Sequence, residues 1–129
     1  MPTTPTNRNP LGEVFDLPAV ALADAGTFAA AGTIRADGRT VSIHGKNGLG
    51  VLTDLRISSS SVRDGVQVPL ATGADLNAAV AGVVSIRPAY PACLAIGCDW
   101  ELLLDAKAAD YLVEAKGAAT TLRITGMVL

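Results

Sequence analysis

The sequence predicts an all-β protein, an antiparallel β-sandwich or jelly roll of about eight strands, with a possible helix within residues 99–116. Three dipeptides that favour tight turns predict this class: Asp37–Gly38, Asn47–Gly48 and Asp64–Gly65. Each lies between two short runs in which apolar and polar residues alternate, which is the pattern of a half-buried strand. Asp-Gly and Asn-Gly provide the positive φ angles of hairpin turns. The three turns together predict an antiparallel meander.

The strands of this meander are expected to begin at residue 27. Alternation is clearest over residues 34–36, 40–44, 53–58 and 66–71. Pro69 has no N–H to donate to a neighbouring strand, so the last of these runs is expected at a sheet edge. Residues 72–77 are expected to form a loop, or one turn of helix that begins at Asp75.

Two more strands are expected before residue 99. The run 80–86 is rich in valine and isoleucine and predicts a buried strand. Pro88 and Pro91 end this strand, and the next is expected to begin at residues 94–96.

Residues 99–116 are compatible with two structures. Helical spacing of apolar residues, with Asp99 as the N-cap and Gly117 just past the end, predicts a helix. The alternative is two strands joined by a turn at residues 107–109, whose inward faces carry Trp100, Leu102 and Leu104, and then Tyr111, Val113 and Ala115. Alanine is abundant throughout the chain, which weakens the helical alternative. The closing run 121–128 predicts a strand in the core, with Leu122, Ile124 and Val128 facing inward.

The chain of 129 residues fits one domain. Residues 1–12 contain three of the seven prolines, with threonine and asparagine between them, and are expected to form an extended N-terminal arm. Residues 13–129 are then a single β-sandwich domain. The N-terminus lacks the basic and apolar segments of a secretory signal, and the longest apolar stretch, 78–86, is far shorter than the roughly 18 residues that span a membrane. Synthesis in a cytoplasm, without a membrane partner, is expected.

The composition is low in charge and in aromatic residues. Charged residues make up 17% of the chain, the formal net charge is −2, and hydrophobic residues make up 50%. Soluble domains usually carry about 25% charge. This composition excludes a disordered chain, and the lack of basic excess argues against a nucleic-acid partner. A small, under-charged domain predicts surfaces that other subunits cover, and hence a homo-oligomer.

No catalytic, cofactor-binding or metal-binding residues are predicted. The glycine-rich stretch 44–50 reads GxxGxG before a strand, whereas phosphate loops need other spacings and a following helix. His44 is the only histidine and lacks a recognisable nucleophile motif. A metal site of His44, Cys93, Cys98 and Asp99 lacks the close Cys/His pairs of structural zinc. The two cysteines are expected to be small buried hydrophobic residues.

Two sets of residues are candidates for binding a partner. Arg35 and Arg39 lie beside a predicted turn, among aspartates, and mixed charge of this kind suits registration between subunits. The arm provides the other candidates, which are Pro2, Thr3, Thr4, Pro5, Asn7 and Arg8.

The end of the chain carries a resemblance to a known class of protein. The segments DYLVEAKG (110–117) and TLRITG (121–126) are similar to the last hairpin of jelly-roll virion modules. Together with the general plan, the chain resembles the capsid cement (decoration) proteins of tailed bacteriophages. Such a resemblance implies a non-enzymatic protein, a trimer, that is made in the host cytoplasm. It would bind the major capsid protein from outside, at the virion surface, without a cofactor.

A module that binds carbohydrate or another ligand is the alternative. Lectin-like sandwiches stack sugars on exposed aromatic side chains, for which Tyr90, Trp100 and Tyr111 are the candidates. The alternation around Trp100 predicts that its ring is buried, which would remove the best of the three. An enzyme is a third, weaker interpretation.

Overall fold

The computed structural model describes residues 13–61, 63–78 and 82–129, and over these ranges the chain forms ten strands and two short 3-10 helices. The strands are β1 (Glu13–Asp16), β2 (Val20–Leu22), β3 (Ala29–Arg35), β4 (Val41–Asn47), β5 (Val51–Ser60), β6 (Gln67–Thr72), β7 (Val83–Arg87), β8 (Asp99–Leu104), β9 (Asp110–Ala118) and β10 (Thr120–Val128). The helices are η1 (Gly73–Ala78) and η2 (Ala92–Leu94). The predicted all-β class is confirmed, with two strands more than the sequence suggested.

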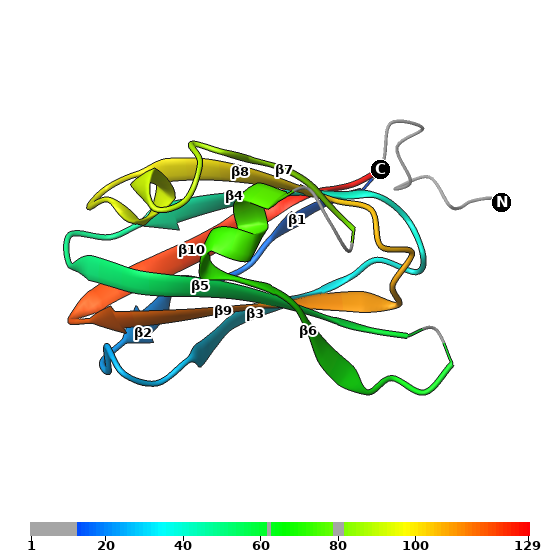
Figure 1. Ribbon diagram of the computed structural model, residues 1–129, viewed down its shortest axis with the longest axis horizontal. Coiled ribbons are helices and arrows are strands. Elements are labelled where there is room, and N and C mark those ends of the chain that lie inside the picture. Colours follow the sequence, from blue (N-terminus) through cyan, green and yellow to red (C-terminus); the bar gives the residue numbers. More distant parts are fainter. Residues whose placement is uncertain (1–12, 62, 79–81) are drawn as a thin grey trace, which may run out of the picture.

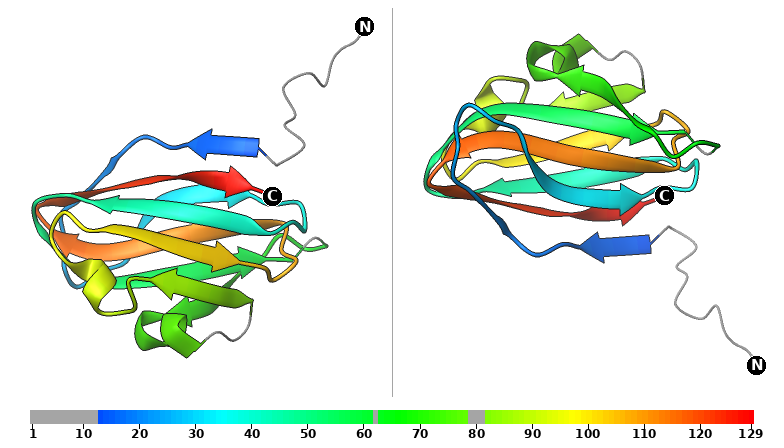
Figure 2. Two further views of the ribbon diagram at one scale, coloured as in Figure 1. Left: turned by 90° about the horizontal axis from the view of Figure 1, so that it is seen from above. Right: turned by 90° about the horizontal axis from the view of Figure 1, so that it is seen from below.

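The strands form two antiparallel sheets that face each other (Figure 1). The larger sheet has the order β1-β10-β4-β8-β7, with β2 also paired to β10, and the smaller sheet has the order β3-β9-β5-β6. Figure 2 shows the two layers from above and below.

The pairing of the strands is nested. β1 and β2 pair with β10, β3 pairs with β9, β4 pairs with β8, and β5 pairs with β6. In sequence, each pair lies between the two partners of the pair before it. The chain therefore folds back on itself as one long antiparallel hairpin, and this hairpin wraps so that its strands contribute to both sheets. Of the two predicted architectures, this connectivity is that of the jelly roll.

The predicted meander is wrong at two of its three turns. Asp64–Gly65 joins the paired strands β5 and β6, as predicted. Asp37–Gly38 forms a tight turn with φ angles of 50° and 78°, but it leads from the smaller sheet into the larger one. Asn47–Gly48 likewise connects β4 to β5 in the opposite sheet. Turn chemistry sets where the chain reverses, whereas the pairing partner is decided by strands distant in sequence.

Residues 99–116 form two strands, and the helical alternative is wrong. Trp100, Leu102 and Leu104 on β8 are buried, as are Tyr111, Val113 and Ala115 on β9. The two strands lie in opposite sheets, joined through Lys107 at a φ of 56°. The resemblance also implied that residues 110–117 and 121–126 form a hairpin. They do not pair with each other, because β9 and β10 lie in opposite sheets.

Other predictions differ at the sheet edges. β6 is an edge strand as Pro69 predicted, and η1 confirms the helical option after it. β7 begins at Val83 and is an edge strand with alternating exposure, where a buried strand was expected. The strand expected at residues 94–96 is instead the end of η2 and a loop. β1 and β2 were not predicted, because they are only four and three residues long.

The core lies between the sheets and is built from small and medium side chains. The largest fully buried residues are Trp100 and Tyr111, and aliphatic residues from both sheets surround them. Gly45 faces Trp100 across the β4–β8 ladder, and the indole ring occupies the space that a side chain at Gly45 would need. Leu76 of η1 is buried where this helix contacts β6 and β7.

Candidate interaction surfaces

The residues considered for a metal site, His44, Cys93, Cys98 and Asp99, do not form a group that could hold a metal ion. His44 lies on the outer face of β4, where its Nε2 is 2.8 Å from Oε2 of Glu101. Asp99 is exposed and paired with Lys46, whose Nζ lies 3.4 Å from Oδ2. Cys93 is fully buried, whereas Cys98 is partly exposed, and both are free thiols. Over the described ranges, no group of three or more histidine, cysteine or acidic side chains could hold a metal ion.

Burial governs the chemistry of Cys93. It raises the pKa of the Cys93 thiol to about 11, with Cys98 as a smaller contribution. A thiol reacts as its thiolate, so the folded protein holds Cys93 in its unreactive form near neutral pH. The prediction of a small buried hydrophobic residue is confirmed for Cys93.

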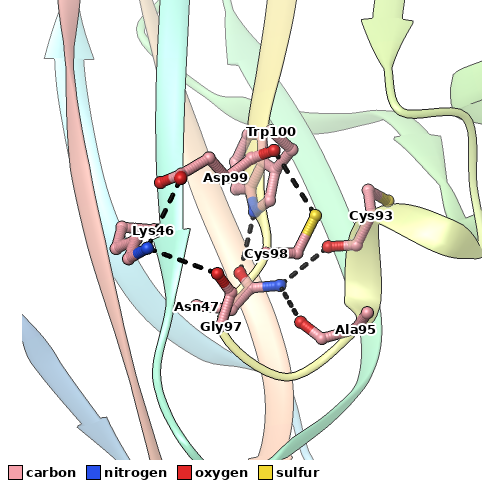
Figure 3. A network of polar contacts seen from close by, with 8 residues as sticks. All are labelled: Lys46, Asn47, Cys93, Ala95, Gly97, Cys98, Asp99 and Trp100. Atoms are coloured by element: carbon pink, nitrogen blue, oxygen red, sulfur yellow. Dashed lines mark hydrogen bonds and ion pairs between the residues drawn. The ribbon is translucent and has the colours of Figure 1, made fainter.

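A buried polar network anchors the loop that follows η2 (Figure 3). The Asn47 side chain is 2% exposed; its Nδ2 donates to the carbonyl oxygens of Cys93 (2.7 Å) and Ala95 (3.0 Å). Its Oδ1 accepts the indole N–H of Trp100 at 2.9 Å. At the surface next to this network, the exposed Lys46 ammonium donates to the carbonyl of Gly97 at 3.3 Å. The glycine-rich stretch 44–50 therefore serves to fasten a loop to the larger sheet.

The three aromatic candidates for sugar binding are buried or half-buried, and their polar atoms form hydrogen bonds within the protein. Trp100 is 2% exposed and Tyr111 is fully buried. The Tyr111 hydroxyl accepts the backbone N–H of Ala106 at 2.8 Å, and burial raises its pKa. Tyr90 is half-buried and its hydroxyl donates to Asp54 at 3.2 Å. Burial, followed by the nearby Asp54 carboxylate, raises the pKa of Tyr90.

The two candidate arginines differ in their availability to a partner. Arg35 is 85% exposed and contacts Asp37 at 3.2 Å. Arg39 is 31% exposed, and its guanidinium lies 3.6 Å from Glu13 of β1. Arg35 therefore remains accessible, whereas Arg39 helps to hold β1 in place. The other candidates, Pro2, Thr3, Thr4, Pro5, Asn7 and Arg8, lie outside the described residues.

A further arginine, Arg56, belongs to a cluster on the smaller sheet. Its guanidinium binds the Glu114 carboxylate through two bonds of 2.9 and 3.0 Å and lies 4.1 Å from the centroid of Phe28. The bond to Glu114 raises the pKa of Arg56. Lys116 lies 4.5 Å from the same ring centroid. These contacts are internal to the chain and link neighbouring strands.

One end of the sandwich, at the left of Figure 1, carries the connection between β4 and β5 and the turn between β9 and β10. Apolar side chains are exposed at this end. The β4–β5 connection contacts the start of β10 and the loop after η2, since the Gly48 N–H donates to Thr121 O (2.8 Å) and the Gly97 N–H donates to Gly48 O (2.9 Å). Leu49 is 89% exposed, Ile96 57% and Val51 53%. A hollow of about 620 Å³ beside Leu49 is lined partly by exposed alanines. We call this surface the apolar end; it comprises Ala21, Ala23, Leu49, Val51, Ile96 and Ala119.

A second hollow lies on the outer face of the larger sheet. It has a volume of about 550 Å³ and runs from β1 across β10 and β4 to β8. We call it the β1 groove; its lining includes Val14, Asp16, Leu103, Met127 and Leu129. Asp16 lies at its margin and binds Arg123 at 2.8 Å. Low charge in the sequence predicted covered surfaces, but it did not locate this groove or the apolar end.

Comparison of the chain with protein-family models, with curated proteins and with solved structures found no match. In the part of the chain that the structure describes, no helix is long and apolar enough to cross a membrane.

Proposed function

We propose that the chain is a non-enzymatic structural protein that assembles with copies of itself and decorates a capsid shell, as the cement proteins of tailed phages do. The observation that carries this proposal is the apolar end. Three large aliphatic side chains are exposed there: Leu49 (89%) and Val51 (53%) at the β4–β5 connection, and Ile96 (57%) in the loop after η2. Burying one such side chain contributes roughly 1.5–3 kcal/mol. A contact that covers all three would therefore stabilise an assembly.

The surroundings of these side chains favour a protein partner. Ala21, Ala23 and Ala119 are small and exposed, so they allow another surface to approach closely around Leu49. Clustered apolar side chains on a small protein mark interaction sites, whereas single ones do not. The preferred partners are further copies of this chain, as a trimer, and a major capsid protein.

The jelly-roll fold supports the same proposal by analogy. Jelly rolls occur in viral capsid domains and in lectins. A lectin would need exposed aromatic surface, but the rings of Trp100 and Tyr111 are buried in the core. Tyr90 is half-buried, and its hydroxyl donates to Asp54. The capsid-associated interpretation is therefore the one that we propose, with the virion surface as its site and no cofactor.

The self-assembly is tested by sedimentation equilibrium of the full chain at micromolar concentration. We expect a trimer for the natural sequence and at least a tenfold weaker association for Leu49→Glu, because a carboxylate would be buried in the contact. Val66→Glu is the matched control, since Val66 is 60% exposed and lies beyond the opposite end of β5. It should remain a trimer. A natural chain that sediments as a monomer, or equal weakening by both variants, would contradict the proposal.

A further inference from the structure

We propose that the N-terminal arm of one copy, residues 1–12, docks in the β1 groove of a second copy. This inference rests on the proposed self-assembly and names the partner of the arm. Three features carry it: the position at which the arm joins the sandwich, the apolar character of the groove, and the charges on the two surfaces.

The arm joins the sandwich at the margin of the groove. The described chain begins at Glu13, which pairs with Val128 near the end of β10, and the next residues of β1 line the groove. Twelve extended residues reach about 40 Å. The four strands beneath the groove, at ~4.8 Å spacing, span about 15 Å. The arm is therefore long enough to leave one molecule and cross the groove of its neighbour.

The direction of β1 favours a neighbour over the same molecule. β1 runs antiparallel to β10, and Glu13 lies opposite Val128. A straight continuation of β1 toward lower residue numbers leads past the end of the sheet. Occupation of its own groove would need a sharp reversal at residue 12, whereas the arm of a second copy needs none.

The chemistry of the groove fits the composition of the arm. Val14 is 72% exposed and Leu129 48% exposed, and Met127 of β10 and Leu103 of β8 also line the groove. The arm contains three prolines and a leucine among threonines and asparagines. Proline-rich segments bind apolar grooves with little loss of conformational entropy, because they are extended before they bind. Methionine adapts its shape to such a ligand.

The charges are complementary. Arg8 is the one charged side chain of the arm, and Asp16 is the one acidic side chain that lines the groove. Asp16 already accepts hydrogen bonds from Arg123, but it is exposed, and a carboxylate has lone pairs for a further donor. Arg8 of a second copy is thus expected to bind at Asp16.

Photo-cross-linking of the full chain tests this contact. Pro5 is replaced by benzoylphenylalanine, and unlabelled protein that carries the probe is mixed with ¹⁵N-labelled protein that lacks it. We expect cross-links from the unlabelled arm to groove peptides of labelled chains, identified by mass spectrometry. Cross-links within one chain only, or to peptides outside the groove, would overturn the inference.

Variants of the labelled protein sharpen the test. Val14→Glu places a charge on an exposed groove position and should lower the yield of cross-links between chains at least fivefold. Val68→Glu is the control, because Val68 is 57% exposed on β6 of the smaller sheet; it should leave the yield unchanged. A larger loss of cross-links between chains with Val68→Glu than with Val14→Glu would contradict the docking. A trimer without groove cross-links would refute the arm contact alone, whereas a monomer would refute the proposed self-assembly as well.

Discussion

Replacing Asn47 by alanine is expected to lower the free energy of unfolding by about 3–5 kcal/mol. The substitution removes three hydrogen bonds in a site where water does not reach the side chain, which is 2% exposed. The indole N–H of Trp100 and the carbonyl of Cys93 would be left without their partner inside the protein. Each unsatisfied buried group costs roughly 1–3 kcal/mol, and the deleted amide also leaves a small cavity.

Chemical denaturation measures this loss, with Asn77→Ala as the matched control. Asn77 also binds backbone atoms, through two hydrogen bonds of 2.8 Å to Tyr90, but its side chain is exposed. Water can replace those bonds, so we expect a loss of only about 1 kcal/mol. In Asn47→Ala the loop after η2 should also loosen, and a thiol reagent should label Cys93 faster. Equal losses for the two variants would show that the Asn47 network does not anchor the loop.

Gly45→Ala has the second-largest expected effect, a loss of about 2–4 kcal/mol. A methyl group at this position would overlap the Trp100 indole ring, which lies directly over the glycine. Overfilling a packed core costs roughly 1–3 kcal/mol. Displacement of the ring would also break its hydrogen bond to Asn47, at a further cost of about 1 kcal/mol.

Fluorescence reports the displacement directly, because Trp100 is the only tryptophan. We expect emission at longer wavelength and stronger quenching by acrylamide in Gly45→Ala, together with a lower denaturation midpoint. Gly26→Ala is the control, since the nearest atom to its added methyl group is Oδ1 of Asp24, at an ordinary distance of 3.4 Å. Its stability should change little. Unchanged emission in Gly45→Ala would show that the close approach of the ring to β4 is not required.

The sequence was informative about which residues face the core, and less so about which strands pair. Alternation identified the inward faces of β8 and β9, because that pattern depends only on neighbouring residues. The turn at Asp37–Gly38 has the predicted local geometry, yet the strands that it joins lie in opposite sheets. Pairing in a jelly roll depends on contacts between the two halves of this long hairpin, which local signals do not encode.

The burial of Asn47 could have been predicted from the alternation of inward and outward residues along β4. Asn47 was assigned to a turn, although it continues the inward series of Val41, Ile43 and Gly45 on β4. An asparagine on an inward face predicts a buried amide that needs partners. The partners themselves are carbonyls of a loop some fifty residues away, so the sequence alone could not name them.

The sequence could predict that the protein has apolar surfaces for other molecules, but it could not predict where on the fold they lie. Low charge predicted that other molecules cover part of the protein. Leu49 and Ile96 come from separate loops, and only the fold brings them to one end of the sandwich. The β1 groove likewise depends on β1, a strand without a sequence signal.

We propose that this protein decorates a capsid, and immunogold electron microscopy of intact particles tests this proposal most directly. An antibody against the purified chain is applied to particles released from the cells that produce it. We predict gold on the outer surface of the particle heads, in a regular arrangement and without prior disruption of the shell. Label confined to tails, to broken particles or to material free of particles would contradict the account.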